Sequence, residues 1–149
     1  EPVTIKPICL RKIVVNDADE HFYLSEQEKI KFDYLRGSKK IERTAPDGSK
    51  YMYSEGAMSP IDELSLPGRT MLTSEGSVNR STHIIKDPKT NRVRILTPNE
   101  CERLNQFPDN WTNSGMPEKR RYFMMGNALV CGIIGTLGIE IEKIIDNEK

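Results

Sequence analysis

The pattern of apolar and polar positions changes twice along the chain and divides it into three parts. In the first part, Ser25 and Glu28 have the spacing of a capping box, in which each side chain bonds the backbone N–H of the other residue. The pattern predicts a helix that follows this box, runs to about Leu35 and ends at Gly37. The residues expected to be buried on it are Ile30 and Tyr34, with Phe32 and Leu35 as further candidates.

The middle part consists of short β-prone runs between loops rich in Gly, Ser, Pro and Asn. A polar, basic connector over residues 39–48 leads into it, and Pro46-Asp47-Gly48 is a typical turn sequence. The candidate strands are residues 50–54, 69–73, 82–86 and 92–96. Upstream of the first helix, residues 3–15 are expected to form short extended or mixed structure.

The last part returns to helical spacing. Thr97 and Glu100 form a second capping box with Pro98 at the first helical position, which predicts a helix to about Gln106. A basic helical stretch over residues 118–122 follows.

A final helix is predicted over about residues 129–145, with a long apolar stripe. Three glycines interrupt it, and each costs about 1 kcal/mol relative to Ala in an exposed helix, so another element is expected to pack closely there. The glycines are Gly132, Gly135 and Gly138. The whole pattern predicts an α+β fold: a small, irregular, mostly-β region at residues 1–96 and a helical C-terminal segment at residues 97–149.

Composition describes a polar chain with enough apolar residues for a modest core, since 36% of residues are hydrophobic and 30% are charged. No apolar run approaches a membrane span, and the first residues lack a signal-peptide pattern, so we expect no membrane partner. The three cysteines are far apart and odd in number, which fits a reducing compartment. Because the chain begins with Glu1 and not Met, we expect it to be part of a longer protein.

The formal net charge of zero conceals an uneven distribution. Residues 16–28 hold five acidic side chains and no Lys or Arg, whereas residues 36–50 hold five basic and two acidic ones. Residues 67–94 hold six basic and two acidic ones. The middle of the chain is therefore the candidate surface for a polyanion, and ordinary solvated loops are the alternative.

Two stretches near the end carry a specific resemblance. Arg94-Ile-Leu-Thr-Pro-Asn-Glu-Cys-Glu-Arg-Leu-Asn-Gln-Phe-Pro-Asp109 resembles the ninth sequence motif of the DNA cytosine-5 methyltransferases, and Gly126-Asn127-Ala128-Leu129-Val130 resembles the tenth. Their order and short spacing match that family too. The resemblance implies that the ninth motif is a capped helix bracing the recognition region. It also implies that Asn127 and Ala128 line the pocket of the cofactor S-adenosylmethionine.

The target-recognition region of this family contains a Thr followed by an apolar residue, just ahead of a base-reading loop, and Thr70-Met71 is similar to that pair. The loop is then residues 74–80. Base contacts are expected from Arg80 to guanine, from Asn79 to adenine, and from a cytosine amino group to Glu75. The remaining expected DNA-binding residues are Ser74, Ser77 and Lys86, which suit phosphate contacts, together with Arg69, Thr70 and Met71. A flexible surface loop is the alternative, and His83 is expected to be structural.

The catalytic residues of the family have no counterpart here. The reaction needs a thiolate that adds to C6 of a flipped cytosine, and in the family that thiol follows a proline. In this chain Cys9 follows Ile8, and the other two cysteines follow Glu100 and Val130, so buried or inert thiols are expected. Acidic neighbours should also raise the pKa of the Cys101 thiol. The isolated chain is therefore expected not to methylate DNA.

The resemblance implies double-stranded DNA as one partner and a catalytic half, in the same polypeptide or a separate subunit, as another. The C-terminal helix is expected to dock on that half or to form a homodimer. By resemblance, the setting is bacterial restriction–modification and the location is cytoplasmic. Two alternatives stay open: a non-catalytic DNA-binding remnant of the fold, and a protein-interaction module that uses the C-terminal helix without touching DNA.

Overall fold

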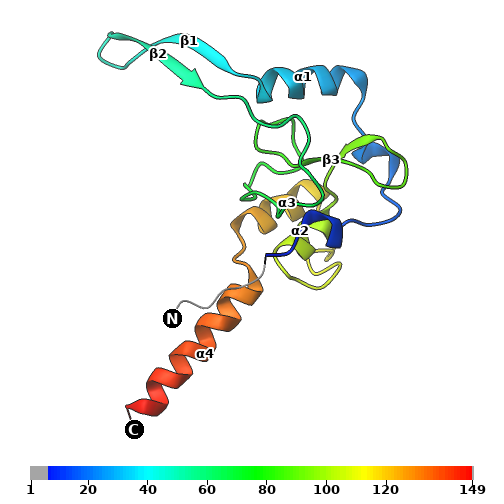
Figure 1. The fold of residues 1–149 in the computed structure, drawn as a ribbon, viewed down its shortest axis with the longest axis vertical. Coiled ribbons are helices and arrows are strands. Elements are labelled where there is room, and N and C mark those ends of the chain that lie inside the picture. Colours follow the sequence, from blue (N-terminus) through cyan, green and yellow to red (C-terminus); the bar gives the residue numbers. More distant parts are fainter. Residues whose placement is uncertain (1–6, 149) are drawn as a thin grey trace.

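A computed structural model describes residues 7–148 and confirms the α+β class, with two separate two-stranded sheets and a long C-terminal helix. Residues 3–6 of the predicted N-terminal extended segment lie outside the described residues. Figure 1 shows a central body from which a hairpin projects at one end and the last helix at the other. The elements are η1 (Leu10–Lys12), η2 (Glu20–Phe22), α1 (Glu26–Arg36), β1 (Lys39–Thr44), β2 (Lys50–Glu55), β3 (Ile84–Lys86), β4 (Val93–Ile95), α2 (Pro98–Leu104), α3 (Glu118–Asn127) and α4 (Cys131–Asn147).

Helix α1 begins at the predicted capping box, since the Ser25 side chain accepts from the backbone of Glu28 and the reciprocal bond is also present. The predicted burial of Ile30 and Tyr34 was wrong: they are 69% and 67% exposed. The buried residues of this helix are Phe32 and Arg36. Arg36 is buried because it forms an ion pair with Asp62, 26 positions away in the sequence. A hydrophobicity pattern does not predict such a contact.

The predicted connector over residues 39–48 was wrong in its first half, which is strand β1. It pairs antiparallel with β2 in a six-pair register from Lys39↔Glu55 to Thr44↔Lys50. The predicted turn is confirmed, since Gly48 has a φ of 84°, a conformation that glycine adopts without strain. The predicted strand over residues 69–73 is not formed, whereas β3 and β4 lie inside two other predicted strands and pair antiparallel.

One hydrophobic core joins both halves of the sequence. Its buried members come from the N-terminal segment, the middle of the chain and the two helices α2 and α3: Leu10, Ile13, Phe22, Met71, Ile85, Leu96, Cys101, Tyr122 and Met125. Helix α2 starts at the predicted second capping box, with Thr97 accepting from Glu100 and Pro98 in the first turn. The body is therefore one packed unit, and the predicted boundary at residue 96 runs through its core.

Close backbone packing locks α3 onto the middle segment. A Cβ atom at Gly126 would lie 2.4 Å from the Leu72 carbonyl carbon and 2.4 Å from the Thr73 nitrogen. A Cβ at Gly76, whose φ is 76°, would lie 2.3 Å from the Tyr122 ring. Both glycines therefore permit contacts that any larger residue would block.

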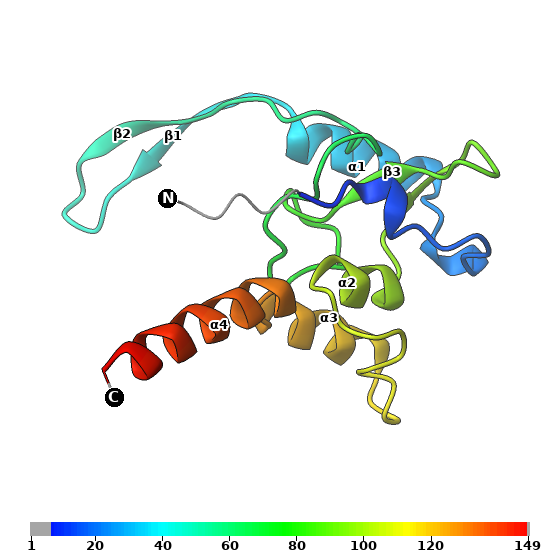
Figure 2. The same cartoon turned by 60° about the horizontal axis from the view of Figure 1, so that its bottom comes forward.

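Helix α4 leaves the body and has no buried residue along its length (Figure 2). It is attached where the Cys131 N–H donates to the Asn105 carbonyl at 3.0 Å. The predicted close partner exists within the described chain for Gly132, where a Cβ would lie 2.2 Å from the Gln106 side chain. Gly135 and Gly138 face open space among the described residues. None of the described helices has the length and apolar character needed to cross a membrane.

The glycine environments give a matched pair of substitutions. We expect Gly126→Ala to destabilise the fold by about 1–3 kcal/mol, because the new methyl group meets rigid backbone. Gly135→Ala should stabilise it by up to about 1 kcal/mol, because it meets nothing and favours the helix. Denaturant unfolding of the two variants measures both effects. Equal stability of the two variants would contradict the packing of α3 on the Leu72–Thr73 backbone.

Candidate nucleic-acid interface

The segments expected to bind DNA and cofactor meet at one cleft. A depression of about 350 Å³ is lined on one side by residues 68–71 and on the other by α2, the end of α3 and the turn that follows. Its far wall consists of Leu104, Asn105, Met125, Gly126, Ala128 and Val130. The Asn105 side chain donates to the Met125 carbonyl at 2.8 Å, which ties α2 to α3 beneath the cleft. The structure thus brings Thr70 and Ala128, 58 positions apart in sequence, to one surface feature.

The start of the predicted reading loop is fixed by a buried pair. Glu75 is 4% exposed, and its carboxylate accepts the His83 backbone N–H at 2.8 Å and faces His83 Nδ1 at 3.0 Å. The expectation that Glu75 accepts a hydrogen bond from a cytosine is inconsistent with this burial, because both oxygens are engaged inside the protein. His83 is fully buried, as a structural histidine should be.

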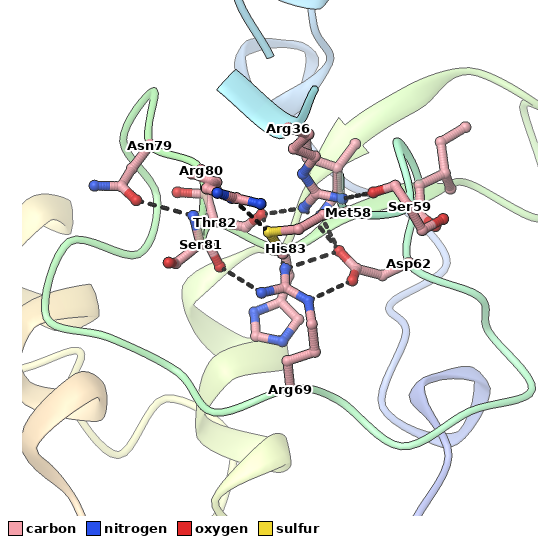
Figure 3. A network of polar contacts seen from close by, with 12 residues as sticks. Arg36, Met58, Ser59, Asp62, Arg69, Asn79, Arg80, Ser81, Thr82 and His83 are labelled. Atoms are coloured by element: carbon pink, nitrogen blue, oxygen red, sulfur yellow. Dashed lines mark hydrogen bonds and ion pairs between the residues drawn. The ribbon is translucent and has the colours of Figure 1, made fainter. Parts of the chain in front are cut away.

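The end of the loop is held by two arginines and one aspartate (Figure 3). Asp62 accepts from Arg36 at 3.0 Å and from Arg69 at 2.7 Å. Both guanidinium groups also donate to main-chain carbonyls: Arg36 to Thr82, and Arg69 to Ser81 at 3.2 Å and to Thr82 at 3.3 Å. Arg69, expected to bind DNA, is therefore used at least partly inside the protein.

The electrostatics of this network keep Asp62 ionised. Burial alone would raise the pKa of Asp62, but hydrogen bonds from Arg69, the Ile84 N–H and Arg36, with the charge of Arg36, lower it to about 2. Arg36 and Asp62 were not among the expected site residues. A Pro-Ile-Asp stretch in a loop carries no local pattern that predicts a buried carboxylate.

Arg80, expected to contact guanine, instead holds the base of the β1–β2 hairpin. Its guanidinium pairs with Glu55, donates to the Gly56 carbonyl, and has Nε 3.0 Å from the Met58 sulfur. The pKa of the Glu55 carboxyl is lowered, chiefly by the hydrogen bond from Arg80. The loop and the hairpin are therefore coupled at this residue.

The other expected DNA-binding residues differ in exposure. Thr70, Ser77 and Lys86 are exposed, whereas Met71 belongs to the core. Ser74 is half-buried and its carbonyl accepts the Ser77 hydroxyl at 2.6 Å. Asn79 is half-buried, and its Oδ1 accepts the Ser81 N–H at 2.9 Å. Among the described residues, the Asn79 side-chain NH₂ has no hydrogen-bond partner. These residues stay predicted contacts, with Met71 as a packing support beneath them.

A buried ion network joins β4, α2 and the N-terminal segment. Arg94 is fully buried and donates to Asp87 at 2.8 Å and to both oxygens of Glu100 at 2.7 Å. Glu100 also accepts the Thr97 N–H at 2.7 Å and the Val15 N–H at 2.9 Å. Burial would raise the pKa of Asp87, but hydrogen bonds from Arg94, Thr90 and Lys89 lower it to about 2.

Another buried carboxylate, that of Glu102, follows Cys101 in the sequence. Glu102 accepts from the Thr112 N–H at 3.0 Å and from Arg121 at 2.9 Å. Burial raises the pKa of the Cys101 thiol well above its usual value, and the charges of Glu75, Glu100 and Glu102 add to that rise. The expected inertness of this thiol is consistent with its surroundings, because a thiol is nucleophilic only as the thiolate. Of the three thiols expected to be buried or inert, only Cys101 is buried; Cys9 is half-buried and Cys131 is exposed, so the inertness of these two stays a prediction.

The two expected cofactor residues are placed differently. Ala128 lines the cleft beside Met125 and Val130, whereas Asn127 is exposed and its side-chain NH₂ donates to the Phe123 carbonyl at 2.9 Å. These residues offer one apolar wall, which fits a partial lining for S-adenosylmethionine and not a complete site. Among the described residues, no cluster of three or more His, Cys, Asp or Glu side chains is placed to hold a metal ion.

Comparisons with known proteins agree on one family. The sequence profile of C-5 cytosine-specific DNA methylases matches residues 6–143. The type II methyltransferase M.Sau3AI of Staphylococcus aureus is 55% identical over 139 residues, which are 93% of this chain and 33% of that protein. The methyltransferase EhMeth of Entamoeba histolytica superposes with a TM-score of 0.61 over 97% of this chain and 42% of that one, at 18% identity, which speaks for the fold alone. The chain thus spans about a third of the length of the curated relative that it matches.

The Asp62 network predicts an acid-sensitive component of stability. The folded-state pKa lies below the ordinary 3.8, so its contribution is full above that value and is lost as the pH falls from about 4 towards about 2. A shift of this size is worth about 2 kcal/mol. We expect Asp62→Asn to lower the free energy of unfolding near pH 7 and to flatten its decline below pH 4, as measured by urea titration across pH. Asp109→Asn, which breaks an exposed pair with Arg103, should change the free energy by less than about 1 kcal/mol, and the Asp62 assignment fails if the two profiles coincide.

Proposed function

The chain belongs to the family of C-5 cytosine-specific DNA methylases, and on that premise we propose that it is the target-recognition and C-terminal part of such an enzyme. In this proposal it binds double-stranded DNA and presents a cytosine to a catalytic part that these residues do not include. The observation that carries the proposal is the cleft where residues 68–71 meet the turn after α3. The two halves of the resemblance, recognition and cofactor lining, come together there.

The cysteines support the absence of a nucleophile in this chain. Cys101 is buried among carboxylates, a setting that disfavours the thiolate. Cys9 and Cys131 follow Ile8 and Val130, not the proline that precedes the family's nucleophile. We therefore propose that the chain alone does not transfer methyl groups.

Helix α4 supports a docking role for the C-terminal end. Its large apolar side chains are roughly half exposed: Ile133, Ile134, Leu137, Ile139, Ile141, Ile144 and Ile145. A monomeric protein rarely exposes so continuous an apolar surface. We propose the catalytic part as its partner. A homodimer through the same helix is the competing outcome.

We also propose that residues 1–96 recognise DNA and that residues 97–149 dock on the catalytic part, although the two ranges share one core.

We propose that this chain supplies only a small part of the cofactor pocket, at the edge of the cleft. S-adenosylmethionine, when bound, supplies the methyl group, and we propose that the catalytic part holds most of it. Ala128 and Asn127 of this chain would close one side of that pocket. The bacterial relative supports a restriction–modification setting in the cytoplasm.

A complementation experiment tests the proposal. A catalytic half that ends before the recognition region would be mixed with the 149-residue chain, duplex DNA and S-adenosylmethionine carrying a labelled methyl group. We expect label in DNA after mixing and none with either half alone. Label transferred by the chain alone contradicts the missing-nucleophile proposal. DNA binding without complementation would favour the non-catalytic remnant, and failure of both would favour the interaction module.

A substitution at Asn79 can test base reading without breaking the hydrogen bond that this residue makes within the loop. Asn79→Asp keeps the oxygen that accepts from Ser81 and removes the side-chain NH₂ donor. We expect the difference in binding free energy between cognate and non-cognate duplexes to fall by about 1–3 kcal/mol, the value of one good side-chain pair to a base. The cognate site would first be selected from randomised duplexes. Gln27→Glu at an exposed position of α1 adds the same single negative charge and is the control. An equal effect of both variants would remove Asn79 from the reading set.

A further inference from the structure

The β1–β2 hairpin is the most prominent feature that the proposed function leaves unused. Six residue pairs at about 3.3 Å each give it a length of about 20 Å. Figures 1 and 2 both show it extending away from the body. Among the described residues each strand pairs with the other one alone, so both outer edges are open. An isolated two-stranded hairpin is marginally stable in water, so a protein that maintains one has a use for it.

The side chains of the hairpin form two exposed faces. Because directly opposed residues of an antiparallel pair lie on the same face, the register places Ile41, Arg43, Tyr51 and Tyr53 together. The Arg43 guanidinium lies over the Tyr53 ring at 3.8 Å. The opposite face carries Lys40, Glu42, Lys50 and Met52. Arginine stacked on tyrosine keeps its N–H edge free, which suits a phosphate better than an apolar partner.

Two cations of the hairpin have no carboxylate partner among the described residues. Lys50 pairs with Glu42 at 2.9 Å, and Lys39 pairs with Glu55 at 3.7 Å. Lys40 and Arg43 make no such pair. Both are exposed and lie between the base of the hairpin and its turn. The hairpin therefore presents uncompensated positive charge to a partner, one cation on each face.

The base of the hairpin is fixed to the recognition loop. Glu55 receives both Lys39 and Arg80, and the Met58 N–H donates to the Arg36 carbonyl at 2.8 Å. These contacts belong to the same network that holds the carbonyls of Ser81 and Thr82 (Figure 3). A ligand of the loop would therefore lie at a set position relative to the hairpin.

We propose that the β1–β2 hairpin is a second DNA-contacting element, in which Lys40 and Arg43 bind phosphates of the duplex whose bases the loop reads. This inference rests on the proposed function. A two-stranded ribbon fits the major groove of DNA, which is about 12 Å wide. Cations on both faces of so narrow a ribbon can reach the phosphates that border the groove. The hairpin adds affinity and register, because phosphate contacts carry no sequence information.

Salt dependence of binding tests this assignment directly. Two phosphate contacts contribute about 1.8 to the slope of log affinity against log salt concentration. We expect Lys40→Ala/Arg43→Ala in the full 149-residue chain to lower affinity for cognate and non-cognate duplexes alike and to reduce the slope by that amount. Raising salt from about 50 to about 200 mM would then weaken the variant about twelvefold less than the parent.

The matched control is Lys12→Ala/Lys31→Ala, which removes the same charge from exposed positions on η1 and α1. An unchanged slope for the hairpin variant, or an equal change in the control, overturns the inference. So does a hairpin variant that binds DNA normally but no longer associates with the catalytic half. Thermal unfolding should change little, because both side chains are exposed and the lost contact between Arg43 and the Tyr53 ring is worth about 0.5–1 kcal/mol.

The outcomes separate this inference from the proposed function. If the hairpin variant behaves as the parent while Asn79→Asp loses discrimination, the hairpin assignment fails and the recognition role stands. If the hairpin variant shows the reduced slope while the parent prefers no DNA sequence, the hairpin binds DNA and the recognition role fails. If the parent binds no duplex at all, alone or with the catalytic half, both fail.

Discussion

The architecture depends on one buried carboxylate, that of Glu100. It neutralises Arg94 from β4, caps the first turn of α2 through Thr97 and receives the Val15 N–H from the N-terminal segment. The N-terminal segment therefore meets the β4–α2 region, 85 positions further along the sequence, at one side chain. Buried charges are tolerated when they are fully paired and hydrogen-bonded, and removing one partner typically costs about 3–5 kcal/mol. The start of α2, a helix whose end lines the cleft, is fixed to β4 and to the N-terminal segment by this arrangement.

Local signals were legible in the sequence, and long-range ones were not. Both capping boxes formed where the spacing of Ser25 and Thr97 placed them, because their bonds close within one helical turn. The strands β3 and β4 also fell within predicted runs. Residues 69–73 look β-prone, yet Arg69 is held by Asp62 and by loop carbonyls, so the backbone follows those contacts and forms no ladder. Hydrophobic spacing misplaced the buried face of α1 because a guanidinium, and not an apolar side chain, makes the key contact there.

The candidate site was predicted only in part for the same reason, because contacts between residues far apart in the sequence decide which charged side chains are free. Charged residues in a basic stretch look alike in sequence, whether they bind a ligand or hold the fold together. Arg69, Glu75 and Arg80 turn out to be engaged inside the protein, while Lys40 and Arg43 remain unpaired among the described residues, in a segment that had looked like a connector. What distinguishes the two groups is the position of a carboxylate many residues away, and no local pattern gives that position. Gly126 and Ala128, from the stretch that resembles the tenth motif of the family, line the cleft, and their contact with a cofactor stays a prediction.

The way in which the loop is held has a consequence for how such proteins diversify. Arg36 and Arg69 grip it by the carbonyl oxygens of Ser81 and Thr82, groups that every amino acid supplies. Exposed side chains of the loop can therefore be exchanged without loss of these contacts, whereas Glu75 and Arg80, which pair with His83 and Glu55, belong to the attachment and must be kept. In the proposed recognition role, the exposed surface of the loop could therefore change between related proteins while the contacts of Arg36 and Arg69 with the main chain stay the same.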